Sequence, residues 1–171
     1  MTTEQLVWVT CGYTFAFLAV VYVTRAATRR ALGALVGGAV AAGFFLGVAD
    51  LGVTTGWWRS PLPSTVGFLA LFYVGTAISL SPIYPVTWRV ARRFGRRGLV
   101  ACLVGAAVIG PPRDYLIAAQ YPEWIAFAPG ITPVLAVAAT YVGALAVGYA
   151  LMWLVAGPAE GDRLARQSKA A

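Results

Sequence analysis

Three ionisable residues lie at or near the ends of long apolar stretches, and their types suit acid–base chemistry or ion pairing. Asp50 closes one such stretch, and Arg113 and Asp114 follow two prolines near the end of another. An ionisable residue within a membrane marks a candidate functional site, because leaving it unpaired costs about 3 kcal/mol or more. Carboxyl groups beside an arginine can protonate or orient a bound molecule. We therefore predict Asp50, Arg113 and Asp114 as the catalytic residues.

Aromatic and polar residues in two connections surround this group. They are suited to line a pocket for a mostly apolar molecule that enters from the bilayer, since they combine apolar walls with hydrogen-bonding groups. Hydration or isomerisation of an alkene in a lipid would suit such a pocket, and a proton relay for transport is an alternative. The predicted ligand-binding residues are Trp58, Arg59, Tyr115, Gln120, Glu123 and Trp124.

A purely structural explanation stands beside this functional one. At 1.5 Å per helical residue, Asp50 lies roughly 28 Å above Ala31, and Arg113 lies roughly 23 Å above Gly98. The two charges therefore reach similar depth, and an ion pair between them would satisfy a broken helix end. The tryptophans would then form an ordinary interfacial belt.

The segment that carries Arg113 and Asp114 also resembles a known family. Arg113, Asp114 and Tyr115, followed by Trp124 and the Ala-Pro-Gly turn at 128–130, are similar to the later part of membrane carotenoid-biosynthesis hydratase-like proteins. In those proteins an acidic residue after an apolar helix precedes a Trp-containing interfacial segment. The resemblance covers about the second half of the chain and implies a lipophilic substrate. Those proteins tend to have more helices than the five spans predicted for this chain.

The composition indicates what kind of element positions these residues. Of 171 residues, 60% are apolar and 11% are charged, and the mean hydropathy is +0.75. A soluble domain would carry about a quarter charged residues. We predict an all-α integral membrane protein, a compact helical bundle over 1–156 with a short cytoplasmic tail at 157–171.

Five membrane spans are predicted, since each crossing needs roughly 20 apolar residues. Pro82 and Pro85 predict a kink near the cytoplasmic end of the third span. In the fourth, the apolar run 98–110 is too short to cross. It must either continue through Pro111 and Pro112 or stop there and return along the outer interface, and both alternatives predict a helix break at the prolines. The spans are 6–24, 31–48, 65–88, 98–119 and 131–155.

The basic residues predict the orientation. Of the 13 Lys and Arg residues, only Arg59 and Arg113 lie outside three clusters, at 25–30, 89–97 and 163–169. Short loops rich in Lys and Arg stay cytoplasmic. The protein is therefore predicted to be a multi-pass protein of the cell (cytoplasmic) membrane, with its N-terminus outside and its C-terminus inside. These loops are expected to contact anionic lipid head groups, and the net charge of +7 does not indicate nucleic-acid binding.

Glycines spaced four apart in the second span, Gly33 with Gly37 and Gly43 with Gly47, predict close helix packing. Packing within the chain is the favoured interpretation. Homo-oligomerisation, or docking on a larger membrane complex as a non-catalytic subunit, is the alternative, and a small transporter or channel is a third. The chain has no histidine and two cysteines, so we predict no metal site and no cofactor.

Overall fold

A computed structural model describes residues 2–61 and 65–157 of the chain. Its helices are α1 (Thr3–Thr24), α2 (Thr28–Thr54), α3 (Val66–Leu80), α4 (Ile83–Gln120) and α5 (Ile131–Ala156). Two short strands, β1 (Trp58–Arg59) and β2 (Ala126–Phe127), lie in the connections. Nearly all of the predicted tail, with the basic cluster at 163–169, falls outside the described residues.

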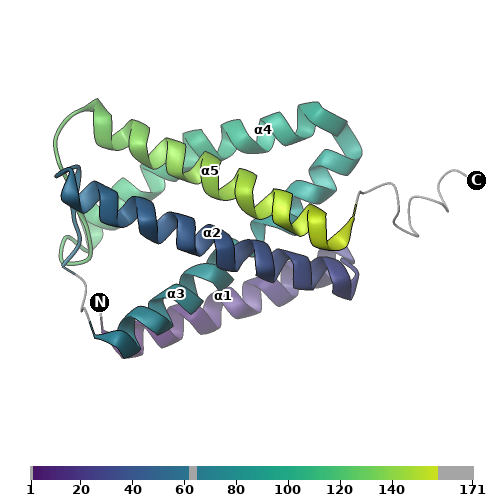
Figure 1. The fold of residues 1–171 in the computed structure, drawn as a ribbon, viewed down its shortest axis with the longest axis horizontal. Helices are drawn as coiled ribbons and strands as arrows, with labels where there is room; N and C mark the ends of the chain where they lie inside the picture. The colour runs from purple at the N-terminus through teal and green to yellow at the C-terminus, as the bar shows by residue number, and fades with distance from the viewer. Residues whose placement is uncertain (1, 62–64, 158–171) are drawn as a thin grey trace, which may run out of the picture.

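The helices pack as a bundle along one long axis (Figure 1). α2 lies against both α5 and α3, while α1 packs on α3 and α4 packs on α5. Large side chains such as Tyr84, Trp88 and Met152 fill the core. Other large apolar side chains, including Phe15 and Ile109, are exposed on the outside of the bundle. A surface helix of a soluble protein turns polar residues outward, so this apolar exterior is typical of a bundle that contacts lipid.

Four helical stretches of the described residues are long and apolar enough to cross a membrane. The sequence predicts five spans, because it separates 65–88 from 98–119 by an Arg-rich loop. In the structure this segment belongs to α4, and both predicted spans lie in one stretch of 55 residues. Arginine is a good helix former, so the charged segment extends the helix. The all-helical class is confirmed apart from the two short strands, but the number of apolar helical stretches is four where five spans were predicted. The stretches are Thr3–Thr24, Thr28–Thr54, Val66–Gln120 and Ile131–Ala156.

The prolines have different effects at the two places where they predict a disturbed helix. Ser81 and Pro82 form a turn between α3 and α4, at the position of the predicted kink. Pro111 and Pro112 lie inside α4, which stays helical there and runs on to Gln120. The φ angle of proline suits a helix, and each proline removes only one N–H donor. The predicted break at 111–112 is therefore wrong, and the helix continues through both prolines.

The real break in α4 is at Gly95, in the middle of the arginine run. Its backbone has φ 61° and ψ −143°, a conformation that only glycine adopts easily. The ribbon turns sharply at this end of α4 (Figure 1). The residues before and after the turn touch, because the carbonyl oxygen of Val90 lies 2.7 Å from where a Cβ on Gly98 would be. Gly95 thus separates α4 into two parts, 83–94 and 96–120.

Small residues allow α2 to approach its neighbours closely. A Cβ on Gly37 would collide with the backbone of Gly148 on α5, whose carbonyl carbon would be 3.0 Å away. A Cβ on Gly38 would likewise collide with the carbonyl of Ala77 on α3 and with Ser81 just after α3. In contrast, nothing lies within 4 Å of the Cβ position of Gly43 or Gly47. The favoured interpretation of the glycine pattern, packing within the chain, is correct for the first half of α2.

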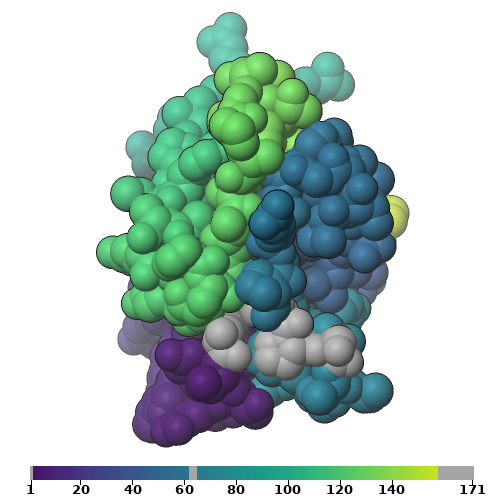
Figure 2. Space-filling model, turned by 90° about the vertical axis from the view of Figure 1, so that its left-hand side faces the viewer, coloured from purple at the N-terminus to yellow at the C-terminus, as the bar shows by residue number. Residues whose placement is uncertain are grey.

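One end of the bundle is closed by the paired connections. β1 and β2 run antiparallel, with Trp58 opposite Phe127, and the N–H of Ala128 donates to the carbonyl of Trp57 at 2.8 Å. Figure 2 views this end and shows the segment after α2 lying against the segment after α4. These bonds hold two segments together that are about 70 residues apart in the sequence.

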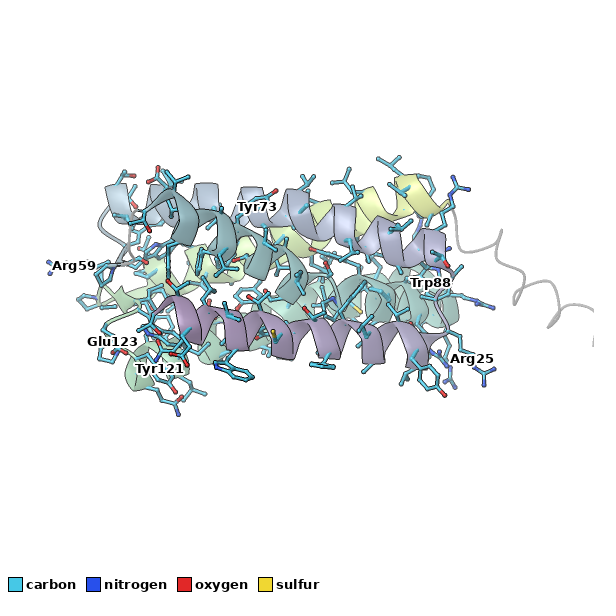
Figure 3. The ribbon with its side chains drawn as sticks, turned by 90° about the horizontal axis from the view of Figure 1, so that it is seen from below. Arg25, Arg59, Tyr73, Trp88, Tyr121 and Glu123 are labelled. Atoms are coloured by element: carbon cyan, nitrogen blue, oxygen red, sulfur yellow. The ribbon has the colours of Figure 1, made fainter. Side chains whose placement is uncertain are left out.

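The two ends of the bundle carry different residues. Arg59, Tyr121 and Glu123 lie at the end with the paired connections, which we call the loop end (Figure 3). Arg25 and Trp88 lie at the opposite end, which we call the basic end. The chain between these ends is almost free of charge.

Candidate functional site

A hydrogen-bonded cluster of four side chains joins α1, α4 and α5 inside the loop-end half of the bundle. One guanidinium nitrogen of Arg113, Nη1, donates to the hydroxyl of Tyr141 at 2.7 Å and to the carboxylate of Asp114 at 3.0 Å. The other, Nη2, donates to the hydroxyl of Tyr13 at 3.0 Å. Tyr141 in turn donates to Asp114 at 2.7 Å. Arg113 and Asp114 also form an ion pair, with the same 3.0 Å between Nη1 and Oδ1.

Helix packing explains how these groups meet. Arg113 lies seven residues before the end of α4, and Tyr13 and Tyr141 each lie ten residues into their helices. At 1.5 Å per residue, all three therefore lie roughly 10 to 15 Å below the loop end. A Cβ on Gly110 would collide with the ring of Tyr141, so this glycine lets the ring lie against the α4 backbone. The ring is thereby placed within one turn of Arg113, where its hydroxyl meets the charged pair.

This cluster closes one end of a cavity inside the bundle. The cavity has a volume of about 320 Å³, which is at the lower end of the range for small-molecule sites. Arg113, Tyr13 and Tyr141 provide its polar lining. Residues from α2, α3, α4 and α5 form the remaining wall: Phe45, Thr76, Ser79, Leu80, Ile83, Tyr84, Ala106, Ala144 and Leu145.

The hydroxyl groups in that wall are already hydrogen-bonded within the protein. Thr76 and Ser79 donate to carbonyls of their own helix at 2.8 Å, and Tyr84 donates to the carbonyl of Ala144 at 3.3 Å. They therefore add little polarity to the cavity. Chemically, the site is an apolar chamber with one polar end, which is lined by a guanidinium and two phenolic hydroxyls. The carboxylate of Asp114 does not line the chamber itself but is hydrogen-bonded to two of these groups.

Of the three predicted catalytic residues, the structure brings two together. Asp50 is exposed near the end of α2 and forms no ion pair with Arg113, so the predicted pair is wrong. Counting residues along the helices places Asp50 and Arg113 at similar depth. Depth does not decide which way a side chain faces, and α2 packs mainly on α5 and α3 rather than on α4. Arg113 pairs instead with its sequence neighbour, Asp114.

The predicted aromatic walls stabilise the connections instead of lining the cavity. Trp58 is 5% exposed, its indole N–H donates to the carbonyl of Ala49 at 3.0 Å, and its ring lies on Gly52. Tyr115 stacks on Phe127 with ring centroids 4.3 Å apart. These contacts dock the two connections onto the ends of α2 and α4.

The other predicted ligand-binding residues lie outside the cavity as well. Arg59, Gln120 and Glu123 are exposed at the loop end, and Trp124 stacks on Tyr121 at 4.3 Å. None of them is among the cavity-lining residues. Any contact they make with a ligand would therefore take place at the surface of the loop end.

Sequence reasoning missed Tyr13 and Tyr141. Both are tyrosines in the middle of apolar helices, at about the same depth as Arg113. That shared depth was a signal that could have identified them, because an arginine within an apolar helix needs hydrogen-bond acceptors. Ser79 and Tyr84, which lie in the sequence beside the prolines of the predicted kink, also line the cavity.

No group of three His, Cys, Asp or Glu side chains that would suit a metal ion occurs in the part of the chain that the structure describes. Comparison of the chain with known protein families, with curated proteins and with solved structures finds no match. The resemblance to hydratase-like proteins therefore gains no support from these comparisons, and the functional argument is based on the geometry of the cavity.

Proposed function

We propose that this protein crosses the cell membrane five times and binds a lipophilic molecule with a small polar group in the bundle cavity. In this proposal α3 and residues 83–94 make one crossing, and residues 96–120 make the return. The basic end faces the cytoplasm, because short segments rich in arginine are retained there. The N-terminus, the loop end and the polar end of the cavity then belong to the outer half of the bilayer.

The observation that supports this proposal best is the polar cluster at one end of an otherwise apolar cavity. A polar group in hydrocarbon is stabilised only by partners, so a ligand would place its polar group at Arg113 and its apolar part along Leu80, Ala106 and Leu145. An arginine and two hydroxyls suit a carboxylate, a carbonyl or a hydroxyl group. The cavity volume limits the enclosed part to a small or narrow molecule.

A chemical step on the bound molecule would depend on Asp114. It is the only carboxylate in the cluster, and Tyr141 and Arg113 orient it. In its protonated form, the Asp114 carboxyl group would transfer its proton to an alkene, and the carboxylate that remains would take a proton back, from the adding water in hydration or from the substrate carbon in isomerisation. The hydrogen bonds of the cluster do not include Asp50, which is exposed near the end of α2. Binding of the lipophilic molecule requires no such step, so the proposed binding site does not depend on catalysis by Asp114.

The docking-subunit alternative lacks a comparable supporting observation. Its strongest argument was the glycine face around Gly37, and α5 already occupies that face. The outward-facing Gly43 and Gly47 remain, but a row of small residues alone does not indicate a partner.

The test compares molecules that co-purify with variants of the full-length protein. Ala106→Leu fills the cavity from a position that is 9% exposed, and Ala101→Leu adds the same side chain on the exposed face of the same helix. Mass spectrometry of organic extracts should detect a lipophilic molecule with wild type and Ala101→Leu, and at least about tenfold less with Ala106→Leu, because a filled cavity excludes the ligand.

Arg113→Gln tests the polar end of the same cavity. It keeps hydrogen-bonding capacity but removes the charge, so it should reduce the amount of co-purified molecule without emptying the apolar part. Equal extracts from Ala106→Leu and Ala101→Leu, with both proteins folded, would show that the cavity is not the binding site.

A further inference from the structure

A second concave site lies at the basic end, far from the cavity of the proposed function. It is a groove of about 610 Å³ between the end of α1 and residues 83–94 of α4. Four arginines contribute to it, which is a high density of positive charge for one groove. Its lining residues are Val23, Thr24, Arg25, Trp88, Arg89, Arg92 and Arg93.

The floor of this groove is held in place by contacts within the protein. Arg89 donates from Nη1 to the carbonyl of Val23 at 3.1 Å, which ties α4 to the end of α1. Trp88 is 1% exposed, and two guanidinium groups lie over its ring, that of Arg30 at 4.1 Å and that of Arg92 at 5.6 Å from the ring centroid. Such stacking orients planar guanidinium groups, which then present a fixed set of donors.

The charge of the groove has no balancing carboxylate nearby among the described residues. Glu4 lies at the opposite end of α1 from the groove, Asp50 near the far end of α2, and Asp114 near the far end of α4. Glu123 lies at the loop end (Figure 3). Guanidinium groups without carboxylate partners bind phosphate well, because their donors match its oxygens.

The surface beside the groove is apolar. Val23 is 68% exposed and Tyr22 is 84% exposed on the last turn of α1, next to Arg25. Tyrosine at such a position is typical of the membrane interface, with its ring toward the acyl chains and its hydroxyl toward the head groups. A ligand that fits both features has a phosphate group and an apolar body attached to it.

We propose that this groove is a specific binding site for an anionic phospholipid. The phosphate lies among Arg25, Arg92 and Arg93, and the acyl chains run along the exposed turn of α1 at Tyr22 and Val23. This inference depends on the membrane placement in the proposed function and is independent of what occupies the cavity. It also goes beyond general attraction between basic loops and anionic lipids, because it assigns the binding to one groove.

The test compares two double variants with the same net charge. Arg25→Gln with Arg93→Gln removes one charge from each wall of the groove, and Arg96→Gln with Arg97→Gln removes two exposed arginines just beyond it. Binding of phosphatidylglycerol to the purified full-length protein is measured by native mass spectrometry. The groove variant should bind about 30-fold more weakly than wild type, and the control variant should lose far less.

Equal losses in the two double variants would overturn the proposal, since they would show that binding depends on total charge. Thermal unfolding of each variant checks that it is folded. If the groove double variant does not fold, the single variants Arg93→Gln and Arg97→Gln are compared instead, and Arg93→Gln should bind the lipid about fivefold more weakly than wild type. Inorganic phosphate at the lipid's concentration should not displace the lipid, and displacement would instead indicate a site for a soluble phosphate. Ala106→Leu should bind the lipid normally, which separates this site from the cavity.

Discussion

Tyr141 is the residue that joins the charged pair to the rest of the cavity. Its hydroxyl accepts a hydrogen bond from Arg113 and donates one to Asp114, so a single side chain provides a hydrogen-bond partner to both charged groups. Asp114 has 18% of its side chain exposed, whereas Arg113 has 48% exposed. The less exposed carboxylate depends on its hydrogen bonds within the protein more than the half-exposed guanidinium does, because less solvent can reach it to replace a lost partner.

We expect Tyr141→Phe to destabilise the protein by about 1 to 3 kcal/mol, because Asp114 and Arg113 each lose a partner. The matched control is Tyr13→Phe, which removes a single hydrogen bond to the same arginine and should cost about 1 kcal/mol. Chemical unfolding of both variants in the same detergent measures the difference. A larger loss for Tyr13→Phe would show that Tyr141 is not the centre of the cluster.

Among the elements, α2 has the most restrictive packing. It lies between α5 and α3, and its small residues set the distance to both. Without a hydrophobic driving force between helices in lipid, close contact over small residues is a main source of stability. The same helix also contributes Phe45 to the cavity wall.

Gly37→Ala should therefore destabilise the bundle by about 1 to 3 kcal/mol, because the new methyl group would collide with the α5 backbone at Gly148. Gly43→Ala is the control on the same helix, where a Cβ meets nothing within 4 Å. It should be neutral or stabilising by up to about 1 kcal/mol, since alanine favours the helix. Unfolding midpoints in detergent provide the measurement, and equal effects would mean that α2 and α5 do not pack as described.

At the scale of the whole molecule, the bundle has two different ends. The loop end holds Arg59 and Glu123, while the basic end holds the arginines around Trp88. Arginine near the surface of an anionic leaflet is stabilised, and moving it through the bilayer is costly. This asymmetry predicts a single orientation in the membrane.

Cysteine labelling in intact cells tests that orientation. In a background without Cys11 and Cys102, a cysteine at exposed Pro61 should react with an impermeant maleimide added from outside. A cysteine at exposed Phe94 should react only after the membrane is permeabilised. Labelling of both positions from outside would contradict the five crossings that we propose.

The sequence by itself determined the all-helical class and one half of the candidate site. A charged pair in a chain with so few charges is visible without a structure, because burying it requires partners that an apolar sequence rarely supplies. Arg113 and Asp114 were identified in this way together with Asp50, and of these three only Arg113 and Asp114 form an ion pair among the described residues. The glycine spacing in α2 likewise indicated close packing, because only small residues allow two backbones to touch.

Only the tertiary structure decided which residues face that pair. Asp50 has the right depth but is exposed, whereas Tyr13 and Tyr141 have the right depth and also face Arg113. Depth follows from counting residues along a helix, but the direction of a side chain depends on how each helix is rotated against its neighbours. That rotation results from contacts such as Gly110 with Tyr141, which join residues from different parts of the chain. The Arg-rich segment shows the same limit. Its composition suggested a loop, but the structure turns at one non-helical residue, Gly95, between two helical parts of α4.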